Sequence, residues 1–346
     1  MVDLLLKTNF TSFKRLEQLH KILIIQTAFL GDVVLATGLI EKLHQFYPSA
    51  KIDFLVRKGN EAVLTEHPII HNLLILDKQK KFQSLIANLR KIRSVNYDLV
   101  INLQRFLSSG ILATLSKGKM IVGFEKNPLS LFFTKRFPHE ISETGTQHEV
   151  ERNHSLIAAV TDDQFSKPRL YPSQEHIKKV SSLKDKPYVT VAPASIWFTK
   201  QWPKRKWVNF LNQVENYVVF LLGAPADKDL CNDIVRETNN VEVVNLAGKL
   251  KPLESVSLMQ DAKMNFVNDS APLHFASSTN APVTAIFNST VPQFGFGPLS
   301  ENSRVIEVNH TLDCRPCGLH GYQACPKGHF KCALEINASA LLNSLA

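Results

Sequence analysis

The chain has 346 residues, of which 44% are hydrophobic and 21% are charged, the composition of an ordinary soluble globular protein. This length predicts two domains, each with its own core. No apolar run approaches the ~20 residues that span a bilayer, and the N-terminus, with Asp3 and a three-leucine run, lacks a secretory signal. A transmembrane or secreted protein is therefore not expected, and we predict a cytoplasmic one.

The formal net charge is +9, with a pI near 9.2. Such a balance favours an anionic partner, which is a nucleic acid, a phosphorylated metabolite or an acidic membrane surface. The sequence contains no helix-turn-helix, zinc-finger or aromatic RNA-binding signature, so no nucleic-acid partner is predicted.

Residues 1–20 precede the first predicted strand. Their leucines and phenylalanines interleave with Lys7, Lys14 and Arg15, as in a helix lying on a membrane surface. A helix packed on the N-terminal domain explains the same pattern and is the preferred interpretation.

Short β-rich runs alternate with helical stretches from residue 21 onwards. Strands are predicted at 21–26, 51–56, 72–76, 97–103 and 119–124, and a helix at 33–46. A polar segment with two prolines, at about 161–187, interrupts this order. Strands then resume at 187–193, 217–223, 241–246, 263–267 and 281–287, and the tail at 332–346 is predicted as one helix.

This alternation predicts an α/β protein with parallel sheets covered by helices on both faces. We expect two Rossmann-like domains whose strands face a cleft with their carboxyl ends. The predicted parts are an N-terminal extension (1–20), a first domain (21–165), a linker (166–186), a second domain (187–331) and a C-terminal helix (332–346).

The stretch FVNDSAPLHFASS, residues 266–278, places polar chemistry where a strand passes into a helix. Pro272 suits the first turn of a helix, and Asp269 or Ser270 can cap it. The amides of that turn favour a phosphate group. The stretch is therefore either a phosphate site or a plain capped turn.

Two further segments follow predicted strands. In TAFLGDVVLATG (27–38), Gly31 permits a tight turn and Asp32 falls near a helix N-terminus. There Asp32 is either a cap or a general base for a substrate hydroxyl. In SIWFTKQWPKRKW (195–207), Lys200 beside Thr199 either neutralises a diphosphate leaving group or is an ordinary solvated lysine.

Taken together, these segments resemble glycosyltransferase family 9, the ADP-heptose:lipopolysaccharide heptosyltransferases, over about residues 21–345. The motifs that carry the resemblance are Gly31-Asp32-Val33, Lys200-Gln201-Trp202-Pro203, Gly223-Ala224, Asn268 to His274, Gly297-Pro298 and the C-terminal cysteines. The family implies a GT-B fold, with the acceptor on the first domain and the sugar nucleotide on the second. It also implies inversion at the anomeric carbon without a catalytic metal.

The resemblance implies roles for individual residues. Asp32 would be the general base, and Lys200 with Thr199 would hold the departing diphosphate. The amides of Ser270 and Ala271 would bind the pyrophosphate. The remaining implied donor contacts are Asp269, His274, Asp227 or Asp229 at the ribose, and Leu250 at the adenine.

One position departs from the family, because similar enzymes usually have glycine where this chain has Ala271. If that position required a positive φ, alanine would cost about 1 kcal/mol. On the acceptor side we expect Gly31, Arg57 and Arg105, since arginine binds phosphate or carboxylate groups with a bidentate fork. Both arginines are also compatible with a plain surface position.

Four of the five cysteines gather at Cys314, Cys317, Cys325 and Cys332. A disulfide framework is not expected in a reducing compartment. The opening Cys-x2-Cys suits a structural zinc site, but the wider second pair favours free buried thiols.

The predicted function is transfer of a heptose from ADP-heptose to the phosphorylated lipid A–inner core of lipopolysaccharide, by an enzyme at the inner face of the cytoplasmic membrane. One alternative is a related transferase with another nucleotide sugar, which binding of UDP or GDP near Asp227 and Leu250 would reveal. The other is a non-catalytic binding protein, which would not need Asp32 or Lys200.

Overall fold

The computed structural model describes residues 18–240 and 242–345. The helix expected within residues 1–20 therefore lies, except for residues 18–20, outside the described part. The chain divides into two compact units. Of the described residues, unit 1 comprises 18–61, 67–140 and 150–166, and unit 2 comprises 62–66, 141–149, 167–240 and 242–345.

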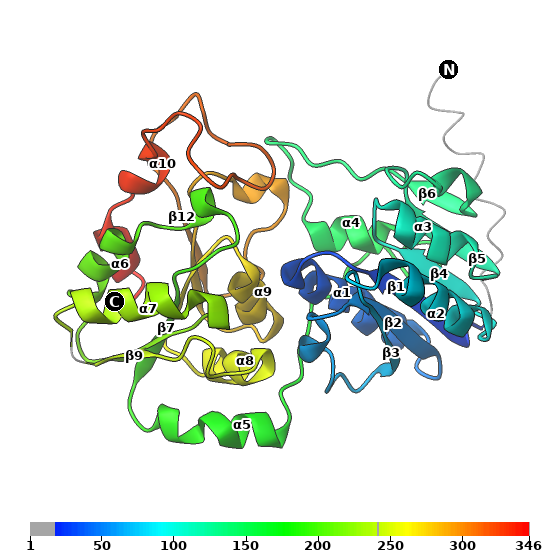
Figure 1. Cartoon of the computed structure of the whole chain (residues 1–346), viewed down its shortest axis with the longest axis horizontal. Coiled ribbons are helices and arrows are strands. Elements are labelled where there is room, and N and C mark those ends of the chain that lie inside the picture. The colour runs from blue at the N-terminus through cyan, green and yellow to red at the C-terminus, as the bar shows by residue number, and fades with distance from the viewer. Residues whose placement is uncertain (1–17, 241, 346) are drawn as a thin grey trace. The chain divides into compact units, whose positions relative to one another are not determined.

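Unit 1 contains a six-stranded sheet in the order β3-β2-β1-β4-β5-β6, with every neighbouring pair parallel (Figure 1). Its strands are β1 (Lys21–Gln26), β2 (Lys51–Arg57), β3 (Ile70–Leu76), β4 (Leu99–Asn102), β5 (Met120–Phe124) and β6 (Lys135–Phe137). The five predicted strands are confirmed. The short edge strand β6 was missed because KRF contains no apolar run.

The helices of unit 1 begin where strands end. They are α1 (Leu30–Phe46), α2 (Lys81–Arg93) and α3 (Leu107–Thr114), with 3-10 turns η1 (Glu61–Val63) and η2 (Ser130–Phe132) and with α4 (Glu149–Ser155) at the division between the units. Helix α1 starts three residues before its predicted start, because the Asp32 carboxylate accepts a hydrogen bond from the Phe29 amide (3.2 Å) and closes the first turn. The tight turn expected at Gly31 is wrong, since Gly31 lies inside α1 without a positive φ.

Unit 2 repeats the same topology, with strand order β12-β11-β10-β7-β8-β9 and parallel pairing throughout. Its strands are β7 (Tyr188–Ala192), β8 (Val218–Leu221), β9 (Val243–Asn245), β10 (Asn265–Asn268), β11 (Val283–Ile286) and β12 (Ser303–Ile306). In both units the order reverses between the first and fourth strands, at β1/β4 and β7/β10. Ligands of such sheets bind outside the carboxyl ends of the strands at this switch point.

The helices of unit 2 are α5 (Gln174–Val180), α6 (Lys204–Leu211), α7 (Lys228–Glu237), α8 (Pro252–Gln260), α9 (Ala271–Ser278), α10 (Lys331–Leu334) and α11 (Ala338–Leu342). Its 3-10 turns are η3 (Ser181–Lys184), η4 (Phe198–Lys200), η5 (Pro225–Asp227) and η6 (Pro292–Phe294). The single tail helix predicted at 332–346 is wrong. Asn337 separates α10 from α11 because its side chain accepts a hydrogen bond from the Ser339 amide and starts a new helix.

Several aromatic side chains pack together within the core of unit 2. Trp202 and Trp207 pack edge to face with ring centroids 5.0 Å apart, and Phe210 packs on Phe266 at 4.7 Å. These contacts fix the segment after β7 against the end of β10, which are the two sides of the switch point.

The domain boundaries stay a prediction. In the segment 166–186 the structure contains α5 and η3, residues from Lys167 cluster with unit 2, and α5 packs on α8. Among the described residues, no helix combines the length and apolar character that crossing a membrane requires.

Candidate functional site

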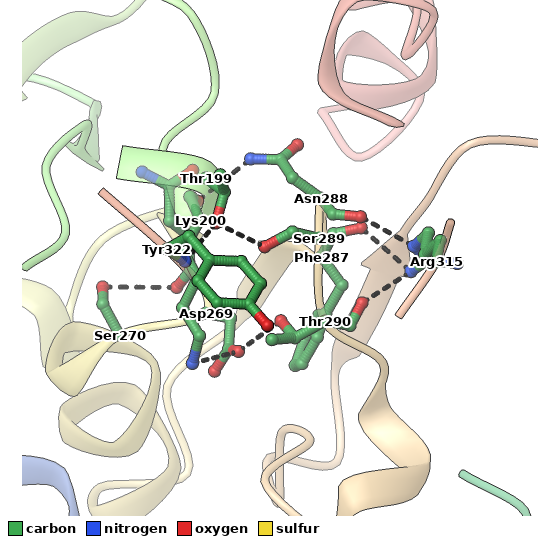
Figure 2. Close-up of polar contacts among 11 residues, drawn as sticks. Thr199, Lys200, Asp269, Ser270, Phe287, Asn288, Ser289, Thr290, Arg315 and Tyr322 are labelled. Carbon is green, nitrogen blue, oxygen red and sulfur yellow. Dashed lines mark hydrogen bonds and ion pairs between the residues drawn. The ribbon is translucent and has the colours of Figure 1, made fainter. Parts of the chain in front are cut away.

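The central feature of unit 2 is an ion pair at its switch point. Lys200 ends η4, which follows β7, and Asp269 directly follows β10. The Lys200 Nζ atom lies 2.6 Å from Asp269 Oδ2, and the side chains are only 14% and 7% exposed (Figure 2). Lys200 is therefore not the solvated lysine that the sequence left open. An ammonium group has three N–H donors, so this pairing leaves two for a ligand.

The N-terminus of α9 lies beside this pair. Ser270 occupies the N-cap position, but its hydroxyl donates to the Asn268 carbonyl (3.3 Å) and does not cap the helix. The Leu273 amide is the first to bond back, to Ser270 (3.0 Å), so the amides of Ser270 and Ala271 precede it, as at any helix start. Pro272 lies in the first turn as predicted. Ala271 has no positive φ, so the departure from glycine causes no strain.

The segment after β11 joins the site, although no role was predicted for it. The Thr290 hydroxyl donates to Asp269 Oδ2 (2.6 Å), the Ser289 hydroxyl donates to Thr199 Oγ1 (3.0 Å), and Asn288 Nδ2 donates to the Lys200 carbonyl (2.9 Å). The available signal was the polar run Asn-Ser-Thr directly after a buried strand, the same signal that identified residues 268–270.

A C-terminal loop, residues 314–322, holds this arrangement in place. Arg315 donates to the carbonyls of Asn288 (2.6 Å) and Thr290 (2.7 Å) and pairs with Glu307. Its guanidinium is thus used to hold backbone carbonyls (Figure 2).

The same loop contacts Thr199. The Tyr322 amide donates to Thr199 Oγ1 (2.8 Å), and the Thr199 amide donates to the Tyr322 carbonyl (3.0 Å). Gly321 has φ +76°, and a Cβ there would lie 2.7 Å from Thr199 Oγ1. Only glycine allows this approach.

Two predicted nucleoside contacts lie on neighbouring loops. Asp227 ends η5 and accepts a hydrogen bond from the Ala224 amide (2.7 Å), while Leu250 is half-buried in the turn before α8. The two loops are tied together by the Gly248 amide, which donates to the Gly223 carbonyl (2.9 Å). Asp229, the alternative ribose contact, lies exposed in the first turn of α7.

His274 is buried in α9, and its Nδ1 atom has no hydrogen-bond partner among the described residues. Burial, and after it the nearby charge of His148, lowers the pKa of His274 to about 3. The imidazole is neutral at pH 7, so Lys200 supplies the positive charge beside α9.

In unit 1, cations and aromatic rings lie together at or just beyond the carboxyl ends of the first four strands. Arg57 lies over Phe29 (5.9 Å from Cζ to the ring centroid), and both Lys78 and Arg105 lie over Phe106 (5.7 and 5.5 Å). These distances are typical of cation–π contacts. We call these five residues the cationic aromatic cluster.

The sequence analysis did not identify Lys78 as a candidate site residue. Its Nζ donates to the Thr27 carbonyl (2.9 Å), and burial followed by the charge of Arg57 lowers its pKa. Nothing in the isolated KQKK run distinguishes it from its solvated neighbours. Asp32, in the first turn of α1, is half-exposed.

The family model for glycosyltransferase family 9 (heptosyltransferase) matches residues 86–321. The chain belongs to glycosyltransferase family 9. It is therefore an enzyme that transfers a glycosyl group.

The family 9 assignment agrees with individual relatives. The chain is 30% identical over 292 residues to lipopolysaccharide heptosyltransferase 3 of Escherichia coli K12, covering 79% of this chain and 83% of that protein. It superposes on E. coli ADP-heptose LPS heptosyltransferase II with a TM-score of 0.76 at 21% identity, covering 94% and 97% of the two chains. For E. coli heptosyltransferase WaaC with ADP-2-deoxy-2-fluoro heptose the TM-score is 0.67 at 19% identity, with 93% and 98% covered. The GT-B fold expected from the sequence is thereby confirmed.

The cysteines of this family 9 chain are all free thiols. Among residues 18–240 and 242–345, no three His, Cys, Asp or Glu side chains are arranged to hold a metal ion, so the alternative of a structural zinc site has no ligand set there. The preferred interpretation of buried thiols is correct for Cys332 but wrong for Cys314, Cys317 and Cys325, which are half-exposed. The loop at residues 314–322, which contains Cys314 and Cys317, is held by bonds such as that from the Cys317 amide to the Ser289 carbonyl (2.7 Å).

His274 also gives unit 2 a pH-dependent stability. An unfolded histidine titrates near 6.5, whereas buried His274 takes up a proton only near pH 3. Between these values the unfolded chain binds the extra proton, so the free energy of unfolding falls as the pH falls through this window. From pH 7.5 to 5.5 the loss from one such histidine is about 1 kcal/mol.

Urea unfolding followed by tryptophan fluorescence measures this loss in unit 2, because all three tryptophans lie at residues 197–207. We expect the decrease between pH 7.5 and 5.5 to be about 1 kcal/mol smaller in His274→Gln than in the unsubstituted protein. An equal decrease in both proteins would contradict a neutral buried His274.

Proposed function

We propose that this family 9 enzyme transfers a heptose from ADP-heptose to the inner core of lipopolysaccharide, with inversion at the anomeric carbon and Asp32 as the general base. The observation that carries the proposal is the buried Lys200–Asp269 pair beside the N-terminus of α9. This arrangement suits a group that leaves as a diphosphate.

The donor's diphosphate would lie at this N-terminus. The amides of Ser270 and Ala271 and the helix dipole favour an anion. Lys200, oriented by Asp269, would donate its remaining N–H groups to the phosphate that gains charge as the glycosidic bond breaks. The heptose complex of WaaC, a protein of the same fold, supports a nucleotide-linked heptose as donor.

The nucleoside would extend from the diphosphate toward the loops of Asp227 and Leu250. A carboxylate that accepts a backbone hydrogen bond, as Asp227 does from Ala224, has a second oxygen available for a ribose hydroxyl. Leu250 offers an apolar contact for the adenine face.

The acceptor would bind unit 1. Asp32 would remove a proton from the attacking hydroxyl. The cationic aromatic cluster combines charges for phosphate or carboxylate groups with rings for the apolar faces of sugars. The name of the 30%-identical relative supports lipopolysaccharide as the acceptor class. Such an acceptor is anchored in a membrane through its lipid A. We therefore propose that the enzyme works at the surface of the membrane that holds the acceptor.

The test is acceptor-dependent release of ADP. Purified enzyme is incubated with ADP-heptose and lipid A–inner core. Parallel reactions contain UDP-glucose or GDP-mannose as the donor in place of ADP-heptose. We expect ADP release only with ADP-heptose and only when the acceptor is present. Release from a UDP or GDP sugar would replace the donor assignment, and tight ADP-heptose binding without turnover on any core acceptor would favour a binding protein.

A further inference from the structure

The positive charge of this chain is concentrated in one segment. Residues 78–139 contain twelve lysines and arginines but only two acidic residues, Asp98 and Glu125, a net charge of +10. The whole chain carries +9, so all the other residues together contribute −1. The segment spans α2, α3, η2 and β6 of unit 1.

Its two acidic residues do little to weaken the field of this segment. Asp98 is 9% exposed, accepts hydrogen bonds from the amides of His20 and Lys21, and pairs with Lys119 Nζ at 2.7 Å. Glu125 Oε1 lies 3.9 Å from Arg136 Nε. Neither carboxylate lies on α2 or α3.

The same segment exposes large apolar side chains. They are Phe82 and Ile86 on α2, Leu107 and Leu115 at the two ends of α3, and Leu131 and Phe132 on η2. Phe82 and Leu131 are 75% exposed and Phe132 is 71% exposed. Phe82 and Ile86 are four residues apart and so lie on the same side of α2.

These three elements cover one face of the unit 1 sheet. Ile92 of α2, Leu112 of α3 and Phe133 directly after η2 share one hydrophobic core cluster with Leu23 and Val100 of the sheet. Helices α2 and α3 also pack against each other (Figure 1). Their exposed residues therefore lie on the outer side of a single layer. We call the six exposed apolar residues, with Lys81, Arg90 and Arg93 of α2, the docking face.

We propose that the docking face binds an anionic phospholipid bilayer. Apolar side chains among lysines and arginines, without acidic residues on the same helices, are the composition of surfaces that lie in a lipid headgroup region. Each lysine or arginine close to an anionic membrane contributes about 1 kcal/mol. The side chains of Leu131 and Phe132, with about three quarters of their surface exposed, suit insertion between headgroups.

The inference rests on the proposed function in one respect, since a lipid-linked acceptor requires the enzyme to work at a membrane. Lys78 and Phe106 connect the two surfaces. Both belong to the cationic aromatic cluster; Phe106 immediately precedes α3, and Lys78 lies three residues before the start of α2, and these two helices carry most of the docking face. If the enzyme docks through this face, the carboxyl edge of the unit 1 sheet lies near the bilayer. An acceptor sugar attached close to the membrane surface would then reach that edge.

Flotation with vesicles tests the proposal without donor or acceptor, so failure of the proposed chemistry cannot affect the result. We expect the full chain to float with phosphatidylethanolamine–phosphatidylglycerol vesicles and to be released from them by salt. It should not bind phosphatidylcholine vesicles. Lys81→Gln/Arg90→Gln/Arg93→Gln should weaken binding by about 100-fold. Phe82→Ser/Ile86→Ser/Leu131→Ser/Phe132→Ser should also release the protein, while turnover of a short water-soluble acceptor remains unchanged.

The matched control is Ile177→Ser/Lys178→Gln/Lys179→Gln on α5 of unit 2, where an isoleucine and two lysines are likewise exposed. It should bind vesicles like the unsubstituted protein, as should a chain without residues 1–17. The proposal is overturned if no vesicles bind, if the serine variant binds normally, or if the control loses binding equally. It is also overturned if deletion of residues 1–17 alone abolishes binding, or if only a soluble anionic oligosaccharide binds the face.

Discussion

Lys200→Met should lower kcat for transfer by about 100- to 1000-fold, the usual effect of removing one group that stabilises developing negative charge. Methionine keeps the length and the apolar stem of lysine but has no charge. The affected step is departure of the diphosphate, because the Lys200 ammonium is held beside the N-terminus of α9 by Asp269 at 2.6 Å. Initial rates over a range of donor concentrations would give kcat and KM separately.

The methionine variant also leaves the Asp269 carboxylate without its cation. This carboxylate is only 7% exposed, and among the contacts described the Thr290 hydroxyl is then its remaining side-chain partner. This unpaired carboxylate would itself repel a diphosphate. The double variant Lys200→Met/Asp269→Asn removes that repulsion. We expect it to recover donor affinity but not kcat. Full recovery of kcat in the double variant would show that Lys200 acts only by balancing Asp269, and an unchanged kcat in Lys200→Met would show that Lys200 has no role in the chemical step.

Asp32→Asn should lower kcat by about 100- to 10,000-fold, the range for loss of a general acid or base, with little change in donor affinity. The substitution removes basicity while keeping the local structure. The introduced asparagine side chain still has an oxygen to accept the hydrogen bond that the Phe29 amide donates at 3.2 Å, so the first turn of α1 remains closed. Pre-steady-state turnover with saturating donor and acceptor isolates the chemical step.

A second capping carboxylate provides the control. Glu254 accepts a hydrogen bond from the Lys251 amide (2.7 Å) at the start of α8, in the same helix position as Asp32 but without a proposed catalytic role. Glu254→Gln should leave kcat unchanged. If the Asp32 and Glu254 variants fell by the same factor, or if neither fell, the proposed proton transfer would be wrong.

Sequence reasoning succeeded where local chemistry and strand order carry the information. Asp269 and Lys200 each follow a buried strand, and parallel strands bring such ends to the same edge of a sheet, so their proximity was predictable. The role of Arg315 was not predictable, because apart from Glu307 its partners are backbone carbonyls after β11. Backbone carbonyls are present at every residue, so a sequence does not show which of them accept a hydrogen bond. Lys78 is distinguished from its neighbours by tertiary contacts, its bond to the Thr27 carbonyl and its position over the Phe106 ring.

The errors have equally local causes. Gly31 suggested a turn, but Asp32 extends α1 backwards by accepting from the Phe29 amide. The cysteines were expected to be buried thiols, whereas Cys314, Cys317 and Cys325 are half-exposed, in a region held by backbone hydrogen bonds and a close glycine. In both cases the residue type suggested one structural role, and the hydrogen bonds of the surrounding backbone determined a different one.

The two hydrogen bonds between Thr199 and Tyr322 join residues 123 positions apart. During translation, all strands of unit 1 are complete at residue 137, but the two bonds between Thr199 and Tyr322 cannot form until the chain has been synthesised beyond residue 322. Synthesis that stops before Tyr322 would thus give a chain able to form the sheet of unit 1 without these two contacts at the switch point of unit 2. The polar network around Lys200 and Asp269 is in this way completed only after the last segment that contributes to it, residues 314–322, has been synthesised.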